Sequence, residues 1–288
     1  MKRKKAGLLV IIAMAGLIFS TLNCVTYLAR AGCGQLSILW RARPIQDVID
    51  DSATSEEVKK KLRHVLVVRN YARDRLNLNL SDSYTKFSAL DRDAVAWNVT
   101  ASRELYFEPR TWWFPIVGTV PYLGYFDKKS AEEKEEELKK EGYDTKLDEV
   151  AAYSTLGWFD DPLLSPQLQM SEWYLTGLVI HEAAHATVWF PGDVDFNESF
   201  ASFVEEKGMM QYYRETNREL FEKLTEYRVE QKIVSEEMRK TAHALDELYR
   251  SSESDAKKRA EKSRLIEELR KRVTDLGSSF KVIRTDRF

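Results

Sequence analysis

Cysteine and histidine are both scarce in this chain of 288 residues, which has two cysteines and four histidines. Two cysteines allow at most one internal disulfide, so a hydrophobic core must supply most of the stability. The 44 lysine and arginine residues are balanced by 46 aspartate and glutamate residues, for a net charge of -2. Because this balance is not that of a basic nucleic-acid-binding protein, we expect no nucleic-acid partner.

The N-terminus lacks an apolar run long enough for a comfortable membrane span. The run from Ala6 to Phe19 follows the basic residues MKRKK and has the length of a secretory h-region. We therefore predict a signal peptide over residues 1–23. Cys24 stands where bacterial lipoproteins are cleaved and acylated, although Asn23 and Thr21 depart from the usual lipobox residues. A lipid on Cys24 is the prediction, with an uncleaved signal anchor as the alternative. Both tether the protein to the membrane, facing the periplasm or the exterior.

The most informative motif is HEAAH, in which His181, Glu182 and His185 follow the H-E-x-x-H pattern. The apolar residues from Trp173 to Phe190 predict a buried helix. Residues four apart lie on one face of a helix, so both imidazoles can reach one metal ion while Glu182 points towards a water molecule. A packing or surface histidine pair is the plain alternative. A metal explains the motif better, because two imidazoles and a carboxylate are costly to bury without a partner.

A catalytic zinc ion generally has three protein ligands and one open position. The segment FNESFASFVEEKG, Phe196 to Gly208, has helical periodicity and follows a short turn. If Asn197 caps this helix, Glu198 lies in its first turn and can face the histidine pair. Alternatively, Glu198 is a solvated carboxylate favoured by the helix dipole. Glu205, seven residues later, is either a residue that orients a ligand histidine or a surface charge.

The pair HEAAH and NESFASFVE resembles the zinc-binding signature of gluzincin peptidases. The resemblance implies that His181, His185 and Glu198 bind one Zn²⁺ ion and that Glu182 is the general base. The gap between the two motifs is shorter here, and no Gly-x-Met-x-Asn-like segment is present to hold a substrate amine. The wider order GQLSILWRARPI, TWWFPIVGTVPYLGYFD, AAYSTLGWFDDPLLS, HEAAH, NESFASFVEE resembles a family of bacterial lipoproteins described as predicted aminopeptidases.

These residues permit peptide hydrolysis by a zinc-held water whose proton is taken by Glu182. The tetrahedral oxyanion generally needs a further donor, and Tyr153 is our candidate, with an aromatic packing role as its alternative. The leading prediction is therefore a zinc peptidase, in particular an aminopeptidase, acting on peptides or proteins. The alternatives are an endopeptidase, a cell-wall amide hydrolase, or a membrane-tethered binding protein whose zinc site has no turnover.

The expected fold class is α+β, with a thermolysin-like core made of a small mixed sheet, the HExxH helix and the glutamate helix. Helices are predicted at 55–76 and 130–140. Strands are predicted in AVAWNV, ELYF and TVPYLGYF and near 144–150, and the strands at 94–107 and 119–126 are candidates to pair with an extended substrate. We expect the peptidase domain to cover 24–208. Two charged helices over 209–288, at 209–250 and 255–276, would form a hairpin.

Overall fold

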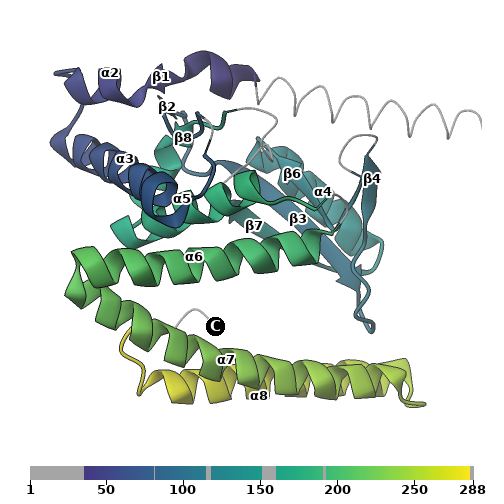
Figure 1. Ribbon diagram of the computed structural model, residues 1–288. Coiled ribbons are helices and arrows are strands. Elements are labelled where there is room, and N and C mark those ends of the chain that lie inside the picture. Colours follow the sequence, from purple (N-terminus) through teal and green to yellow (C-terminus); the bar gives the residue numbers. More distant parts are fainter. Residues whose placement is uncertain (1–35, 81, 115–117, 151–159, 191–192, 286–288) are drawn as a thin grey trace, which may run out of the picture.

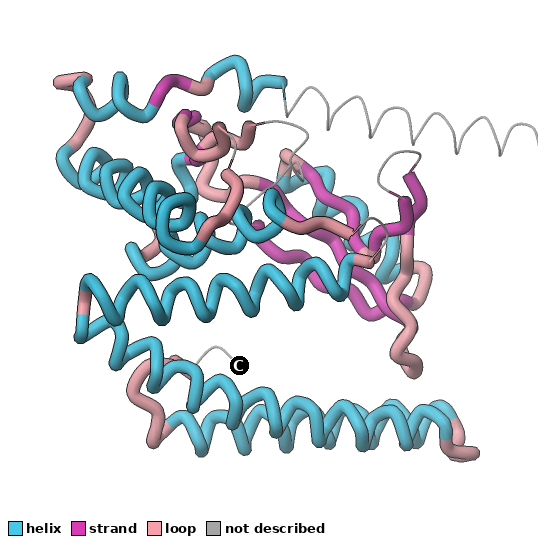
Figure 2. The backbone as a smooth tube through the Cα atoms, in the orientation of Figure 1, coloured by secondary structure: helices cyan, strands magenta, loops and turns pink. Residues whose placement is uncertain are grey.

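The computed structural model describes residues 36–80, 82–114, 118–150, 160–190 and 193–285. Most strands gather on one side of the molecule, whereas a few short strands lie among the helices on the other side (Figure 2). The helices are α2 (Ile45–Asp50), α3 (Glu56–Leu76), α4 (Lys128–Lys140), α5 (Glu172–Thr187), α6 (Val194–Thr216), α7 (Arg218–Arg250) and α8 (Asp255–Gly277), with a 3-10 turn at Ser165–Gln169. The strands are β1 (Arg43–Pro44), β2 (Lys86–Ser88), β3 (Ala96–Arg103), β4 (Trp112–Phe114), β5 (Gly118–Val120), β6 (Tyr122–Tyr125), β7 (Tyr143–Val150) and β8 (Leu163–Leu164).

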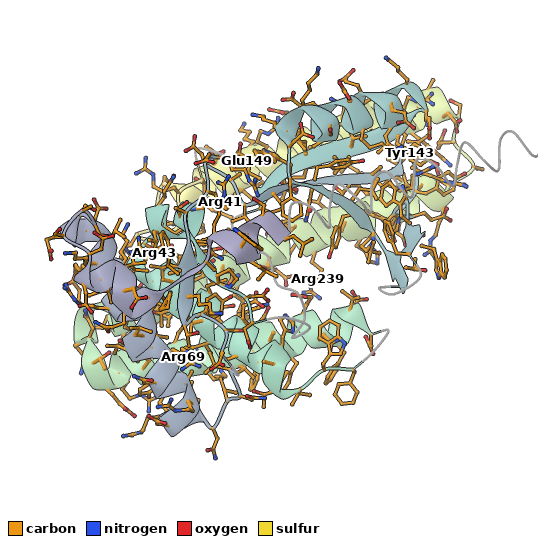
Figure 3. All side chains as sticks on the ribbon, turned by 90° about the horizontal axis from the view of Figure 1, so that it is seen from above. Arg41, Arg43, Arg69, Tyr143, Glu149 and Arg239 are labelled. Atoms are coloured by element: carbon orange, nitrogen blue, oxygen red, sulfur yellow. The ribbon has the colours of Figure 1, made fainter. Side chains whose placement is uncertain are left out.

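The largest antiparallel sheet has the strand order β6-β3-β7, and α4 covers one of its faces (Figure 1). Tyr143 and Glu149 mark the two ends of β7 beside α4 in Figure 3. Trp97, Val99 and Ala101 of β3 pack with Ala131 and Leu138 of α4. The alternation of buried and less buried residues along β3 is that of a strand with one covered face. Because β3 lies between two partners, the prediction that it pairs with a substrate is wrong; β6 forms an edge.

The main core lies around α3, α5 and α6, which places the HEAAH helix among apolar neighbours. Leu175, Val179 and Ile180 of α5 are fully buried, and they pack with side chains of α3 and α6. Ser171 caps α5, because its side chain accepts a hydrogen bond from the backbone N–H of Tyr174. The apolar residues from which the HEAAH helix was predicted are therefore buried between α3 and α6.

The segment ELYF is a turn, so its prediction as a strand is wrong. Of its residues only Leu105 is buried, and a helix rather than a sheet covers it, whereas Tyr106 and Phe107 are more than half exposed. Leu105 packs with Leu245 and Tyr249 of α7, and the rings of Phe107 and Tyr249 are 5.4 Å apart. The aromatic and apolar composition of this tetrapeptide therefore predicted neither its secondary structure nor the exposure of its two aromatic residues.

The C-terminal helices α7 and α8 lie side by side and cover one side of the molecule (Figure 1). Arg259 of α8 binds Glu104 at 2.9 Å, which attaches the hairpin to the turn after β3. The predicted helix at 209–250 is wrong at its start. Helix α6 continues past Gly208 to Thr216, and the break between α6 and α7 falls at Asn217.

The last described residues are held by a buried carboxylate on α7. Glu230 is 2% exposed and accepts hydrogen bonds from the backbone N–H groups of Lys281, Val282 and Ile283, at 2.5–3.3 Å. Burial opposes the charge of Glu230, but these three donors outweigh it and lower the pKa of the carboxyl. The C-terminal tail is thus bound to the hairpin through its backbone.

Two of the sequence predictions, the signal peptide over 1–23 and the acylated Cys24, lie outside the described residues. In the part of the chain that is described, no helix has both the length and the hydropathy needed to cross a membrane.

Candidate metal centre

Helices α5 and α6 lie side by side (Figure 1). The two histidines of HEAAH are one turn apart on α5 and contact glutamates of α6. The Nε2 atoms of His181 and His185 are 3.1 Å apart. His185 is buried, with 8% of its surface exposed. The helical spacing predicted that the two imidazoles converge, and the structure confirms it, because both Nε2 atoms point to the same place.

Glu198 of α6 completes a group of three donors. Its carboxylate oxygens lie 3.4 Å from His181 Nε2 and 3.5 Å from His185 Nε2. With metal–ligand bonds of about 2.0–2.1 Å, the edge of a tetrahedral zinc site is about 3.3 Å. The three separations are close to that edge, so His181, His185 and Glu198 could hold one metal ion. Glu198 is half exposed, with 54% of its side chain accessible, which leaves the group open on one side.

Asn197 fixes the loop that brings Glu198 to the histidines, in a different way from the one predicted. Asp193 caps α6 by accepting from the backbone N–H of Phe196, so Glu198 lies in the second turn. The Asn197 side chain is buried and forms two hydrogen bonds with the backbone of Phe190, at 2.8 and 2.9 Å. Asn197 therefore ties the start of α6 to the end of α5, next to the metal ligands.

Glu205, also on α6, accepts a hydrogen bond from His181 Nδ1 at 2.9 Å. A hydrogen bond at Nδ1 fixes the imidazole tautomer and leaves the Nε2 lone pair for a metal. The structure thus brings Glu205 into direct contact with a ligand histidine. The signal in the sequence was the spacing of seven residues, which puts Glu198 and Glu205 on one face of α6.

The metal-free cluster holds a proton. Burial lowers the pKa of His181, but the hydrogen bonds with Glu198 and Glu205 and the charge of Glu182 outweigh burial and raise it to about 10. The hydrogen bonds from His181 and His185 lower the pKa of Glu198 to about 2. A cation is therefore strongly favoured at the point where the three ligands meet, whether it is a proton or a metal.

Glu182 follows His181 in α5 and lies within electrostatic reach of two tyrosines, Tyr84 and Tyr174. Burial raises the pKa of Tyr84 and Tyr174, and the negative charge of Glu182 contributes to both shifts. Tyr84 is 2% exposed and has a φ of 60°, which is unfavourable for a bulky side chain. Strained backbone that persists in a well-packed core is common at functional sites. Tyr84 was missed in the sequence because nothing local indicates its contact with α5.

A further tyrosine, Tyr122, is the first residue of the edge strand β6. Burial raises its pKa, and the negative charge of Glu198 raises it further, which places the phenol within electrostatic reach of the metal group. Tyr122 is 42% exposed, so it is accessible to a substrate. Tyr153, the oxyanion donor predicted from the sequence, lies outside the described residues.

A buried polar network supports the first half of α5. Thr176 accepts hydrogen bonds from the His64 ring at 2.8 Å and from the Tyr213 hydroxyl at 2.9 Å, and donates to the carbonyl of Glu172 at 2.9 Å. Burial lowers the pKa of His64, which favours its neutral form. This network joins α3, α5 and α6 about one turn before His181, so His64 has a structural place.

Among the comparisons with known proteins, the one with family models gives a match. A family model described as "Putative aminopeptidase" matches residues 26–286, which is most of the chain. No match to the chain was found among curated proteins or among solved structures.

Proposed function

The chain belongs to the family described as putative aminopeptidases, and on this premise we propose that it is a zinc-dependent peptidase. The observation that carries the proposal is the convergence of His181, His185 and Glu198: the two Nε2 atoms are 3.1 Å apart, and each lies 3.4 or 3.5 Å from one carboxylate oxygen of Glu198. Two imidazole nitrogens and one carboxylate are the ligand set of catalytic zinc sites that keep a position for water or substrate. A closed structural site would have a fourth protein ligand.

The roles of the protein side chains follow from their positions. When bound, zinc would act as a Lewis acid towards the scissile carbonyl and lower the pKa of water at its open position. In this proposal Glu182, which follows His181 in α5, would accept the proton from that water and return it to the leaving amine. Glu205 holds His181 in the tautomer that leaves Nε2 free. Edge strand β6 is the described strand best placed to align an extended substrate, because a peptide can add to a free strand edge.

Tyr122 takes the place of the oxyanion donor in this proposal, and replacing it with phenylalanine should lower kcat by about 100-fold. The reason is the loss of one O–H donor aimed at the developing negative charge, while the ring and its packing remain. Steady-state kinetics on a cleaved peptide would measure the effect. Tyr106→Phe removes an equally exposed phenol elsewhere on the surface and is the matched control. Unchanged kcat in Tyr122→Phe, with a loss in Tyr153→Phe, would assign the role to Tyr153.

We further propose that the peptidase works outside the cytoplasmic membrane, held by a lipid on Cys24 after removal of residues 1–23. The basic start and short apolar run favour export, and the position of the cysteine favours acylation. Tethering by one modified residue would leave the metal site free to meet peptides or envelope proteins.

The zinc content of the protein from residue 25 onward tests the proposal directly. We expect about one zinc per chain after purification without added metal, and a clear loss in Glu198→Ala, because two ligands hold zinc poorly. Glu206→Ala is the matched control, since Glu206 lies on the same helix but pairs with Arg228 at 2.7 Å. No zinc in the parent protein, even after reconstitution, would favour a membrane-tethered binding protein instead.

Substrate specificity is tested on any peptide that the zinc-loaded protein cleaves. Acetylation of its N-terminal amine should stop cleavage if the protein is an aminopeptidase. Continued cleavage would identify an endopeptidase.

A further inference from the structure

Gly177 lies on α5 one helical turn before His181, and it faces Glu205 of α6. A Cβ atom at this position would stand 2.5 Å from Glu205 Oε1 and 3.3 Å from Glu205 Cδ, with the flexible Met209 side chain next at 3.1 Å from its Sδ. The other carboxylate oxygen of Glu205 accepts the hydrogen bond from His181 Nδ1 at 2.9 Å. The space left by the missing side chain is therefore occupied by the carboxylate that orients a metal ligand.

We propose that Gly177 is a positioning residue, whose lack of a side chain provides the space in which Glu205 reaches His181. Glycine is unfavourable in the middle of a helix, and the backbone of Gly177 is ordinary helix, so no left-handed conformation requires it. Close packing with Glu205 is the reason that the structure offers. The inference rests on the proposed zinc site, because the purpose of the contact is to orient His181 for a metal.

Gly208 provides the comparison that separates this role from general helix packing. A Cβ atom on Gly208 would stand 2.9 Å from Ile180 and from Leu76, which are apolar core residues. Both glycines thus let α5 and α6 approach closely, but only Gly177 makes room for a group bound to a metal ligand. Alanine at either position favours the helix, so neither variant weakens α5 or α6 through propensity.

The experiment is a double-mutant cycle read out as zinc affinity, measured by competition with a chromophoric chelator. We expect Gly177→Ala and Glu205→Ala each to weaken zinc binding by about 10- to 100-fold. If Gly177 acts through Glu205, the double variant binds zinc as well as Glu205→Ala alone. Gly208→Ala should stay within about threefold of the parent, even where it unfolds at a lower temperature. Three results would each overturn the inference. These are a double variant whose loss of zinc affinity is the product of the two single losses, a Gly177→Ala variant with unchanged zinc affinity, and a Gly208→Ala variant that loses as much zinc affinity as Gly177→Ala.

Two further readouts keep the test decisive. If Gly177→Ala does not fold, removal of the Glu205 side chain in the same chain should restore folding, and failure to do so would contradict the proposed contact. In metal-free protein, the Nδ1 proton of His181 should give a downfield NMR signal that is lost in Gly177→Ala and kept in Gly208→Ala. This signal does not depend on zinc. If the parent protein binds no zinc, the proposed function is refuted, but the NMR signal still tests whether Gly177 allows Glu205 to reach His181.

Discussion

Replacing Glu182 with glutamine should lower kcat by about 1,000-fold while zinc content stays at that of the parent protein. The carboxamide keeps the shape of the side chain but cannot accept the proton from water. Glu182 is next to His181 in the helix, but the metal group is formed by His181, His185 and Glu198. The variant should therefore separate proton transfer from metal binding, with kinetics on a cleaved peptide and metal analysis as the two measurements.

Glu206→Gln is the control for this experiment, because it makes the same chemical change in a glutamate that pairs with Arg228. It should keep the parent kcat. Full activity in Glu182→Gln would mean that another residue is the base. Loss of zinc from Glu182→Gln would mean that Glu182 is itself a ligand, and the proposed division of roles would be wrong.

Zinc affinity should rise about tenfold for each pH unit between about pH 6 and pH 9. The pKa of His181 in the metal-free protein is about 10, so in this range zinc must displace one proton from the imidazole. Glu198, with a pKa of about 2, is already ionised and releases none. Chelator competition at several pH values would measure the slope. A flat profile would contradict a protonated His181. In Glu205→Gln the rise of zinc affinity with pH should level off at a lower pH, because the hydrogen bond and the charge of Glu205 no longer raise the pKa of His181.

The same proton also stabilises the metal-free fold, with a defined sign. Because the folded pKa of His181 exceeds its unfolded value of about 6.5, its contribution is complete below that pH and is lost as pH rises through about 10. The melting temperature of chelated protein should therefore fall over this range relative to zinc-loaded protein. Metal-loaded protein has no such proton to lose, so its curve serves as the reference.

The convergence of His181, His185 and Glu198 could be predicted from the sequence, because the information for it is local. His181 and His185 are one helical turn apart, and Glu198 is the first carboxylate on the next predicted helix beyond a short turn. The helix of the HEAAH motif was predicted at 173–190 and is found at Glu172–Thr187. Local periodicity was enough in these cases, because side chains on one face of a helix converge wherever the helix packs.

Apart from Glu205, the supporting residues could not be predicted, because their partners are distant in the sequence. Tyr84 approaches Glu182 across about 100 residues, and His64 meets Thr176 across 112. Asn197 was predicted as a helix cap, yet Asp193 takes that role and frees Asn197 to bind the end of α5. Capping residues of similar chemistry lie close together there, and the preceding turn decides between them. Gly177 has no sequence signal at all, since a glycine in a predicted helix only lowers its propensity.

The attachment of the C-terminal tail to Glu230 has a consequence for how freely the sequence there can vary. The carboxylate accepts hydrogen bonds from three backbone N–H groups of residues 281–283, and the charge of Lys281 makes a smaller contribution. Most substitutions at these positions would therefore leave the contact intact, and proline alone among the amino acids would remove a donor. Among relatives we therefore expect glutamate to be kept at position 230 while residues 281–283 vary. Low sequence similarity in these last residues would not mean that the tail has lost its contact with α7.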